Sequence, residues 1–169
     1  MKPTPRITGR PLIPDGYGVK PEGSYLEWAS VEARLVESLH YWMATTRRNG
    51  SPHVVPRWGV WLDDSFWYDG SPATRHAINL MSNAAATLHL EDGVSVTILD
   101  GVSSASDPIA GELGTRLSAA FRRKYEALGY APEPDVWSGG DAGGLLRFSP
   151  KTALAWSTFP DDLTRFSFE

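Results

Sequence analysis

The stretch that decides the fold is YWMATTRRNGSPHVVPRWGVWLDDSFWYDGSPATRHAINLMSNAAATLHLED, residues 41–92. Its first six residues, 41–46, include aromatic and β-branched side chains, which favour a strand. Asn49-Gly50 follows, a pair typical of tight hairpins because both turn positions tolerate a positive φ. The opening of this stretch therefore predicts a β-hairpin.

The return strand of this hairpin is expected over residues 53–62. Pro56 lies inside it and cannot donate a backbone hydrogen bond, so we expect a sheet edge, a bulge or an unpaired position there. The polar run 63–65 predicts the next turn, and residues 66–68 predict a third strand. Together the three strands form a meander.

Three helices are expected around this meander. Ser30 is a suitable N-cap for a helix over residues 31–39, which carry an apolar stripe. A short helix is expected over residues 74–82. Asp107 is expected to cap a longer helix that begins at Pro108 and runs to residue 128.

Further strands complete an antiparallel sheet of six or seven strands, enough to curl into a barrel. The long segment 131–143 is rich in Pro, Gly and Asp and predicts a loop. The remaining strands are expected at residues 86–90, 94–104, 145–148 and 152–157, with a last edge strand at 163–168. The fold class is therefore mainly β, of the α+β type.

One domain is expected over residues 24–169, preceded by an extended N-terminal arm over residues 1–23. The arm contains five prolines and four glycines, which argues against any regular element. We expect it to be either loose or wrapped over a neighbouring molecule.

Composition excludes several classes of function. The net charge of −4 gives no general attraction for nucleic acid or acidic membranes, and the absence of cysteine excludes thiolate catalysis and disulfides. No apolar run could span a bilayer, and the first residues lack the apolar segment of a secretory signal, so we expect a cytoplasmic protein. The four histidines do not have metal-ligand spacing, so no metal site is expected.

The stretch over residues 41–92 resembles the core of the pyridoxamine 5′-phosphate oxidase-like family. The resemblance rests on an ordered set of pieces: a hairpin A-T-x-x-x-x-G-x-P-H-V-V-P, a tryptophan-rich strand end, a turn G-S-x-x-x-R-x-A-x-N-L and a strand L-H-L-E. The closing segments at residues 153–156 and 164–166 are also similar. The resemblance implies a split β-barrel that forms a homodimer, with a flavin held in the groove between the two subunits.

The resemblance assigns the phosphate end of this cofactor to a turn at the start of the second helix. Ser71, Thr74, Arg75 and His76 lie there, and a helix start with a nearby cation suits an anion. The family usually has Arg-Lys where this chain has Arg75-His76. An ordinary solvated helix start is the alternative interpretation.

The resemblance also assigns part of the second strand to the cofactor. Its backbone would face the isoalloxazine edge and the ribityl chain, through the residues His53, Val54, Val55, Pro56, Arg57 and Trp58. Family members often carry Arg and Lys where this chain has His53 and Trp58. Arg57 is expected on the opposite side of the strand from Trp58, because side chains alternate. Trp58 would then either cover the ring or pack as a core or interface residue.

Tyr68, Asp69 and Gly70 end the third strand near the expected ribityl and phosphate region. A carboxylate is unfavourable beside a phosphate unless it is paired, and Arg75 is the expected partner of Asp69. Trp61 and Trp67 are expected in the core or at an interface. From the far end of the chain, Trp156 and Arg165 match a Trp and an Arg that approach the flavin from the partner subunit in family members.

The function implied is a flavin-dependent oxidoreductase that passes a hydride to or from a small organic substrate. FMN is the plain choice of cofactor, and the deazaflavin coenzyme F-420 is the rival, with Lys20, Arg47, Arg48 and Arg75 available for its anionic tail. No catalytic side chain is identified, since in such enzymes the cofactor supplies the chemistry. The alternatives are a non-catalytic binder of flavin, haem or another planar ligand, and a barrel that acts only as an interaction scaffold.

Overall fold

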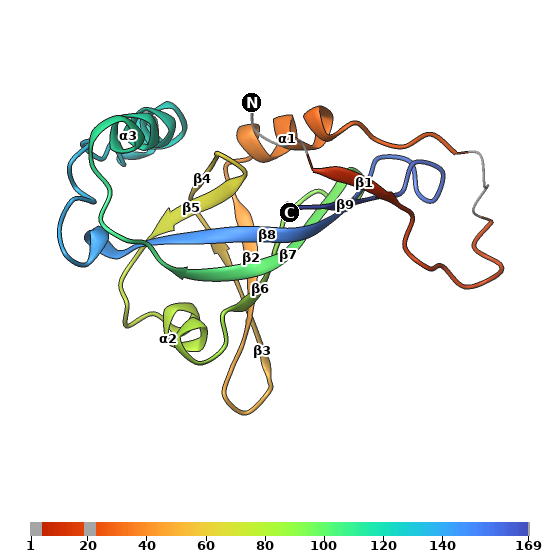
Figure 1. Ribbon diagram of the computed structural model, residues 1–169, viewed down its shortest axis with the longest axis horizontal. Helices are drawn as coiled ribbons and strands as arrows, with labels where there is room; N and C mark the ends of the chain where they lie inside the picture. The colour runs from red at the N-terminus through yellow and green to blue at the C-terminus, as the bar shows by residue number, and fades with distance from the viewer. Residues whose placement is uncertain (1–4, 19–22, 169) are drawn as a thin grey trace.

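The computed structural model describes residues 5–18 and 23–168 of the chain. One antiparallel sheet of nine strands curls around an apolar interior, and three helices lie around it (Figure 1). The helices are α1 (Trp28–Glu37), α2 (Arg75–Ser82) and α3 (Gly111–Tyr125). The strands are β1 (Arg6–Gly9), β2 (Tyr41–Thr46), β3 (Pro52–Arg57), β4 (Val60–Leu62), β5 (Ser65–Asp69), β6 (Ala85–His89), β7 (Val96–Ala105), β8 (Leu145–Trp156) and β9 (Thr164–Ser167).

The sheet has the order β1-β9-β8-β7-β6-β2-β3, and β5 joins it by pairing with both β4 and β8. The first part of β8, through Phe148, pairs with β5, and its last part, from Thr152, pairs with β9. One edge of β8 therefore pairs with two strands, β5 and β9. Its other edge pairs with β7 along most of its length. Residues 149–151 of β8, between the parts that pair with β5 and β9, pair with neither.

The hairpin predicted at Asn49-Gly50 is confirmed. Gly50 has φ +82°, and the Arg47 amide donates to the Ser51 carbonyl at 2.9 Å across the turn. The register pairs Thr46 with Pro52 and continues to Tyr41 and Arg57. Strand β3 lies at one end of the sheet order, so the edge position predicted from Pro56 is also confirmed.

Two apolar clusters hold the molecule together. The barrel interior contains Phe66, Leu88 and Phe166, and α1 closes one end of it with Trp28 and Leu35. The second cluster packs α3 against the outside of β4 and β5. Its members include Val60, Trp67, Leu117, Phe121, Tyr125 and Trp137. Trp61 and Trp67 are both buried, as expected for core tryptophans.

Two expected helix starts were wrong. The first helix begins at Trp28 with Glu27 as its N-cap residue, so Ser30 lies inside the first turn and its hydroxyl donates to the Glu27 carbonyl at 2.8 Å. Burial of Trp28 against Phe166 draws this extra turn into the helix. Helix α3 begins only at Gly111, because Ala110 before it is extended (φ −145°, ψ 176°), so neither Asp107 nor Pro108 lies at the helix start.

Three expected strand boundaries also differ. Part of the N-terminal arm is regular, since β1 pairs with β9 along an otherwise unpaired edge. The return strand expected over 53–62 is interrupted at Trp58-Gly59, which divides it into β3 and β4. The two strands expected at 145–148 and 152–157 form the single strand β8.

The continuity of β8 through Pro150 has a local cause. Pro150 lies opposite Gly101, where the register between β7 and β8 shifts by one residue. A Cβ on Gly101 would stand 2.2 Å from the Ser149 carbonyl oxygen, so only glycine permits this close approach.

No helix in the described part of the chain is long and apolar enough to cross a membrane.

Candidate functional site

A pocket of about 310 Å³ opens where β3 and β5 end. It is lined by Pro56, Arg57, Trp58, Asp69 and Tyr130, and we refer to it as the Arg57–Tyr130 pocket. Four of these residues were predicted from the sequence as cofactor-binding residues. Arg57 and Trp58 line the pocket together, contrary to the expected alternation, because β3 ends at Arg57 and the strand geometry no longer holds at Trp58.

Arg57 is the cation of this pocket. Its guanidinium lies 5.5 Å from the centroid of the Tyr68 ring, and its Nη2 donates to the Asp69 carbonyl. The Nε atom is buried and has no hydrogen-bond partner among the described residues. Burial lowers the pKa of the guanidinium from its ordinary value, yet an arginine keeps its charge at any physiological pH. The pocket therefore contains a fixed positive charge.

Asp69 is paired by Tyr130, not by the expected Arg75. The Tyr130 hydroxyl donates to a carboxylate oxygen of Asp69. Burial, together with this hydrogen bond, raises the pKa of Tyr130, so the phenol stays protonated as the donor. Tyr130 follows α3 and comes 61 residues after Asp69, and no local motif in the sequence marks it as a site residue.

Trp58 forms the wall of the pocket. Its indole is 38% exposed and stacks on the Tyr125 ring, with centroids 4.9 Å apart and an interplanar angle of 9°. Tyr125 is itself buried, and its hydroxyl accepts from the Gly59 amide at 3.0 Å. Helix α3 thus holds the indole in one orientation, with part of its surface open to a ligand.

The predicted phosphate turn is folded, but its polar groups largely satisfy one another. The Ser71 hydroxyl accepts from the Ala73 amide at 3.2 Å, and the Thr74 hydroxyl donates to the Ser71 carbonyl at 2.8 Å. Gly70 closes the turn by donating to the Gly144 carbonyl at 3.3 Å. Arg75 is exposed, so it is the one side chain of the turn that carries an accessible positive charge.

His76 is only 3% exposed and lies 3.3 Å, by its Nε2, from the Thr74 hydroxyl. Burial, with the charge of Arg57 as the next cause, lowers the pKa of His76 to about 4. The imidazole is therefore neutral at pH 7. It cannot replace the positive charge that a lysine would supply at this position.

The remaining predicted residues of β3 and β5 lie around the pocket without lining it. His53 is half-buried, and its pKa is lowered by burial and by the charges of Arg47 and Arg75. Val54 is exposed on the edge strand, and Val55 pairs with Met43 in the sheet. Tyr68 is buried, and its hydroxyl bonds to the Ser103 hydroxyl at 2.7 Å.

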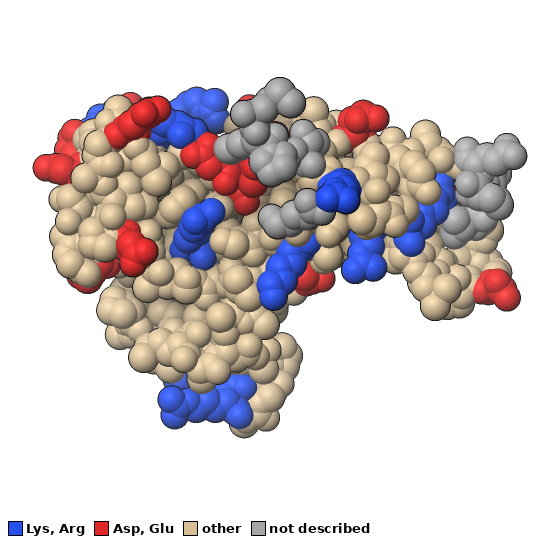
Figure 2. All heavy atoms as spheres, in the orientation of Figure 1, with Lys and Arg blue, Asp and Glu red and all other residues tan. Residues whose placement is uncertain are grey.

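Positive charge gathers near this edge strand. Arg47 and Arg48 are exposed in the turn of the β2–β3 hairpin, and Figure 2 shows basic side chains at the lower tip of the molecule, where that turn lies. Arg75 lies near the same strand, since its charge, like that of Arg47, lowers the pKa of His53. Lys20, also predicted to help hold an anionic tail, lies outside the described residues.

Trp156 and Arg165 lie apart from the pocket within one chain. Trp156 ends β8 and contacts Phe159, with ring centroids 5.6 Å apart. Arg165 is exposed on β9, opposite Leu154. The sequence assigned both residues to the site of a partner subunit, a prediction that one chain alone does not test.

The chemistry that the pocket offers is binding chemistry. A fixed aromatic face, a guanidinium and a paired carboxylate suit a flat ring with a polar edge. Among residues 5–18 and 23–168, no group of three or more His, Cys, Asp or Glu could hold a metal ion. Any redox chemistry at this site would therefore have to come from a bound group.

Comparisons with known proteins bear on the fold. No protein-family model matches the sequence, and no curated protein is similar enough in sequence to match it. Solved structures do match. They include an F420 reductase, at 18% identity and a TM-score of 0.52, with 83% of this chain and 98% of that chain covered.

Two further structures match over most of this chain. A heme-binding protein from Mycobacterium smegmatis has 16% identity and a TM-score of 0.60, covering 88% of this chain and 59% of that one. A putative pyridoxamine 5′-phosphate oxidase from Listeria innocua has 8% identity and a TM-score of 0.55, covering 77% and 98%. At these identities the likeness establishes the shared fold.

Proposed function

Because the chain has the split-barrel fold of the pyridoxamine 5′-phosphate oxidase-like proteins, we propose that it binds a flavin-type cofactor and works as an oxidoreductase. The observation that carries this proposal is the Arg57–Tyr130 pocket. It brings together four residues that the family resemblance assigned to the cofactor, and these include the fixed indole of Trp58 and the cation Arg57. The Arg57 guanidinium lines the pocket and supplies a positive charge for the polar edge of a cofactor ring.

The roles of the chain's own residues follow from their contacts. Trp58 covers one face of the ring, in an orientation that Tyr125 fixes. Arg57 places positive charge at the polar edge of the ring, where it stabilises a negatively charged reduced form. Tyr130 holds the Asp69 carboxylate away from that edge. When bound, the cofactor would supply hydride transfer to or from a small organic substrate.

FMN and coenzyme F-420 place different demands on this chain. FMN needs donors for a terminal phosphate, and the predicted turn offers Arg75 as a cation, since His76 is neutral at pH 7. F-420 also carries an anionic tail, which would lie along the basic side chains of Arg47, Arg48 and Arg75 beside β3. Both cofactors remain candidates, and direct binding separates them.

The proposal includes a homodimer with two shared sites. The Arg57–Tyr130 pocket is open to solvent beside the edge strand β3, so a second copy would complete its outer wall. Trp156 and Arg165 of that second copy would then reach the cofactor. Two-fold symmetric dimers are the commonest oligomers, and each would contain two equivalent sites.

A non-catalytic binder of haem or another planar ligand is the second candidate. The neutral His76 supports it, because a ligand without a phosphate at this turn loses nothing from the missing charge. A heme-binding protein is among the structures that share the fold. A third possibility, a barrel that binds no cofactor and serves as a scaffold, predicts no saturable binding of any planar ligand.

One experiment separates the three functions. The purified chain is titrated with FMN, F-420 and haem in parallel, and any cofactor that binds is first reduced chemically and then tested for transfer of its electrons to an artificial acceptor. Saturable flavin or deazaflavin binding with turnover supports the oxidoreductase. Tight binding of haem alone, or binding without turnover, supports the binder, and no binding leaves the scaffold.

A further inference from the structure

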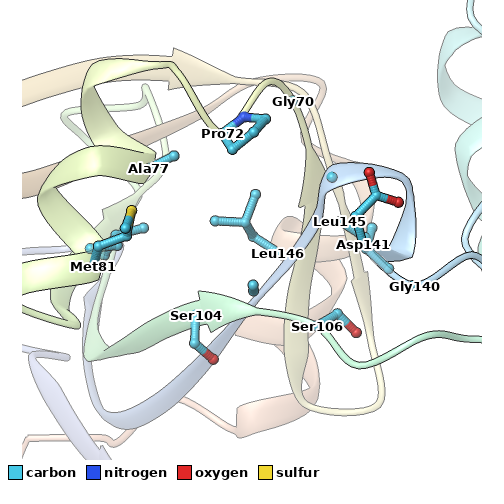
Figure 3. A pocket seen from close by; sticks show the side chains of 13 residues that line it. Gly70, Pro72, Ala77, Met81, Ser104, Ser106, Gly140, Asp141, Leu145 and Leu146 are labelled. Carbon is cyan, nitrogen blue, oxygen red and sulfur yellow. The ribbon is translucent and has the colours of Figure 1, made fainter.

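A second cavity lies beside the turn that follows β5, away from the Arg57–Tyr130 pocket. Its volume is about 400 Å³, and no residue lines both cavities. Asp69 lines the first pocket, whereas Gly70, the next residue, lines the second. The second cavity is enclosed by α2, the end of β7, the start of β8 and the glycine-rich loop before β8 (Figure 3).

The wall on the side of α2 is apolar. Ala77, Leu80 and Met81 are spaced three and four residues apart, so they share one face of the helix. Leu146 adds the floor, and Figure 3 shows it between Ala77 and Met81 on one side and Asp141 on the other. Met81 is 84% exposed, although methionine is usually a buried residue. Ala77, Leu80 and Leu146 are each 7% exposed, so Met81 presents most of the apolar surface that a ligand would remove from water.

The opposite wall contains the charge of the cavity. Asp141 is the only ionisable side chain among the described residues that line it, so no lysine, arginine or histidine is there. The Asp141 Oδ1 accepts from the Gly143 amide at 3.0 Å, which fixes the carboxylate to its own loop. The loop is pressed against the turn after β5, because a Cβ on Gly144 would lie 2.5 Å from the Gly70 carbonyl oxygen.

We propose that this cavity binds a small, largely apolar molecule that carries no negative charge and places a hydrogen-bond donor or a positive charge at Asp141. The volume falls within the range of about 300–1,000 Å³ that small-molecule sites occupy. Apolar contacts with α2 and Leu146 supply the affinity, and the carboxylate selects the charge. The phosphates of FMN and of F-420 are repelled by Asp141, so this site is not a second cofactor site.

The test uses two fluorescent dyes with one ring system. N-phenyl-1-naphthylamine is neutral and has one N–H donor, whereas 8-anilinonaphthalene-1-sulfonate adds a negative charge. We expect saturable binding of the neutral dye at one molecule per chain. The sulfonate should bind about tenfold more weakly, the effect of a like charge several ångströms away near the protein surface.

Three variants locate the dye. Asp141→Asn keeps an acceptor for the Gly143 amide and removes the charge, so the difference between the two dyes should largely disappear. Ala77→Phe fills the cavity and should abolish binding of the neutral dye. Ala119→Phe is the matched control, because Ala119 is exposed on α3 and lines neither cavity. Met81→Ser, at an exposed position, weakens binding without endangering the fold if Ala77→Phe is unstable.

The proposal is overturned if the neutral dye does not bind, or if both dyes bind equally to the unmodified protein. It is also overturned if Ala77→Phe and Met81→Ser, folded by circular dichroism, bind the dye as well as Ala119→Phe does. Displacement of the dye by FMN or F-420 would place it in the cofactor site and would equally contradict the proposal. The outcomes with the two dyes and the variants do not depend on whether the Arg57–Tyr130 pocket binds a cofactor.

Discussion

The indole of Trp58 lies flat on the ring of Tyr125, with the two centroids 4.9 Å apart. Tyr125 is the last residue of α3, and its hydroxyl contacts the backbone of Gly59 next to Trp58. A helix that packs on the outside of the barrel therefore sets the orientation of a residue in the candidate site.

Substitution of Trp58 by Ala should weaken cofactor binding about 5- to 150-fold, since stacking on an aromatic face contributes about 1–3 kcal/mol. The fold should lose little, because the indole is 38% exposed. Trp58→Phe should retain most of the affinity. Binding is measured by quenching of cofactor fluorescence, and thermal unfolding checks stability.

The matched control is Trp42→Phe, at a partly buried tryptophan that stacks on His89 and lines neither pocket. Equal affinity of Trp58→Ala and the unmodified protein would show that the indole is only a packing residue.

The Tyr130–Asp69 hydrogen bond should contribute about 1–2 kcal/mol to stability, as hydrogen bonds to charged groups do when partly buried. Tyr130→Phe and Asp69→Asn should each destabilise the protein. Their double variant should be less unstable than the sum of the two, by about 1 kcal/mol. Urea denaturation of the four proteins measures this coupling, and strict additivity would mean that the contact is not made in solution.

The sequence predicted those parts of the fold and site that depend on neighbouring residues. The hairpin at Asn49-Gly50 is such a part, because it depends on a local turn in which Gly50 adopts a positive φ. The assignment of Trp58 and Asp69 to one site was also predicted, whereas Arg57 was expected on the other side of the strand and lines the pocket because β3 ends there.

The parts that the sequence did not predict depend on long-range packing. Tyr130 reaches the site only because α3 packs across the barrel and the chain returns from it. Strand β1 forms in a segment with many prolines because β9, far along the chain, offers a free edge. His76 was expected at the surface as a donor, and the packing of α2 against the barrel buries it.

His76 should make the protein sensitive to acid. Burial lowers its pKa to about 4, below the ordinary value of 6.5, so between these pH values the unfolded chain holds more protons than the folded one. Stability should therefore fall as pH decreases from 6.5 to 4, by about 1–3 kcal/mol from this residue.

The variant His76→Gln should lose this part of the pH dependence. His40→Gln, at a half-exposed histidine, should behave like the unmodified protein. Denaturant unfolding at several pH values measures the difference, and parallel curves for His76→Gln and the unmodified protein would contradict the burial of this imidazole.

Lys124 should make the free energy of unfolding depend on pH above pH 7. Its amine donates to the Ser38 carbonyl at 2.7 Å and to the Tyr41 hydroxyl at 2.6 Å. Burial, with Arg123 as the next cause, lowers its pKa to about 7 from 10.5. The unfolded chain therefore holds more protons between these values, and stability should rise with pH from 7 to 10.5.

Lys124→Met should remove that rise, whereas Lys151→Met, at an exposed position on β8, should leave it unchanged. The free energy of unfolding at pH 7 and at pH 9.5 is the quantity to compare. An identical rise in Lys124→Met and the unmodified protein would show that another group is responsible.

The most direct measurement is a titration of the purified protein with FMN and with coenzyme F-420, followed by quenching of their fluorescence. The account predicts saturable binding of one of them at one molecule per chain, with affinity lost in Arg57→Gln and kept in Arg123→Gln, at an exposed arginine of α3. If neither cofactor binds, or if Arg57→Gln binds as well as the unmodified protein, the Arg57–Tyr130 pocket is not a flavin site.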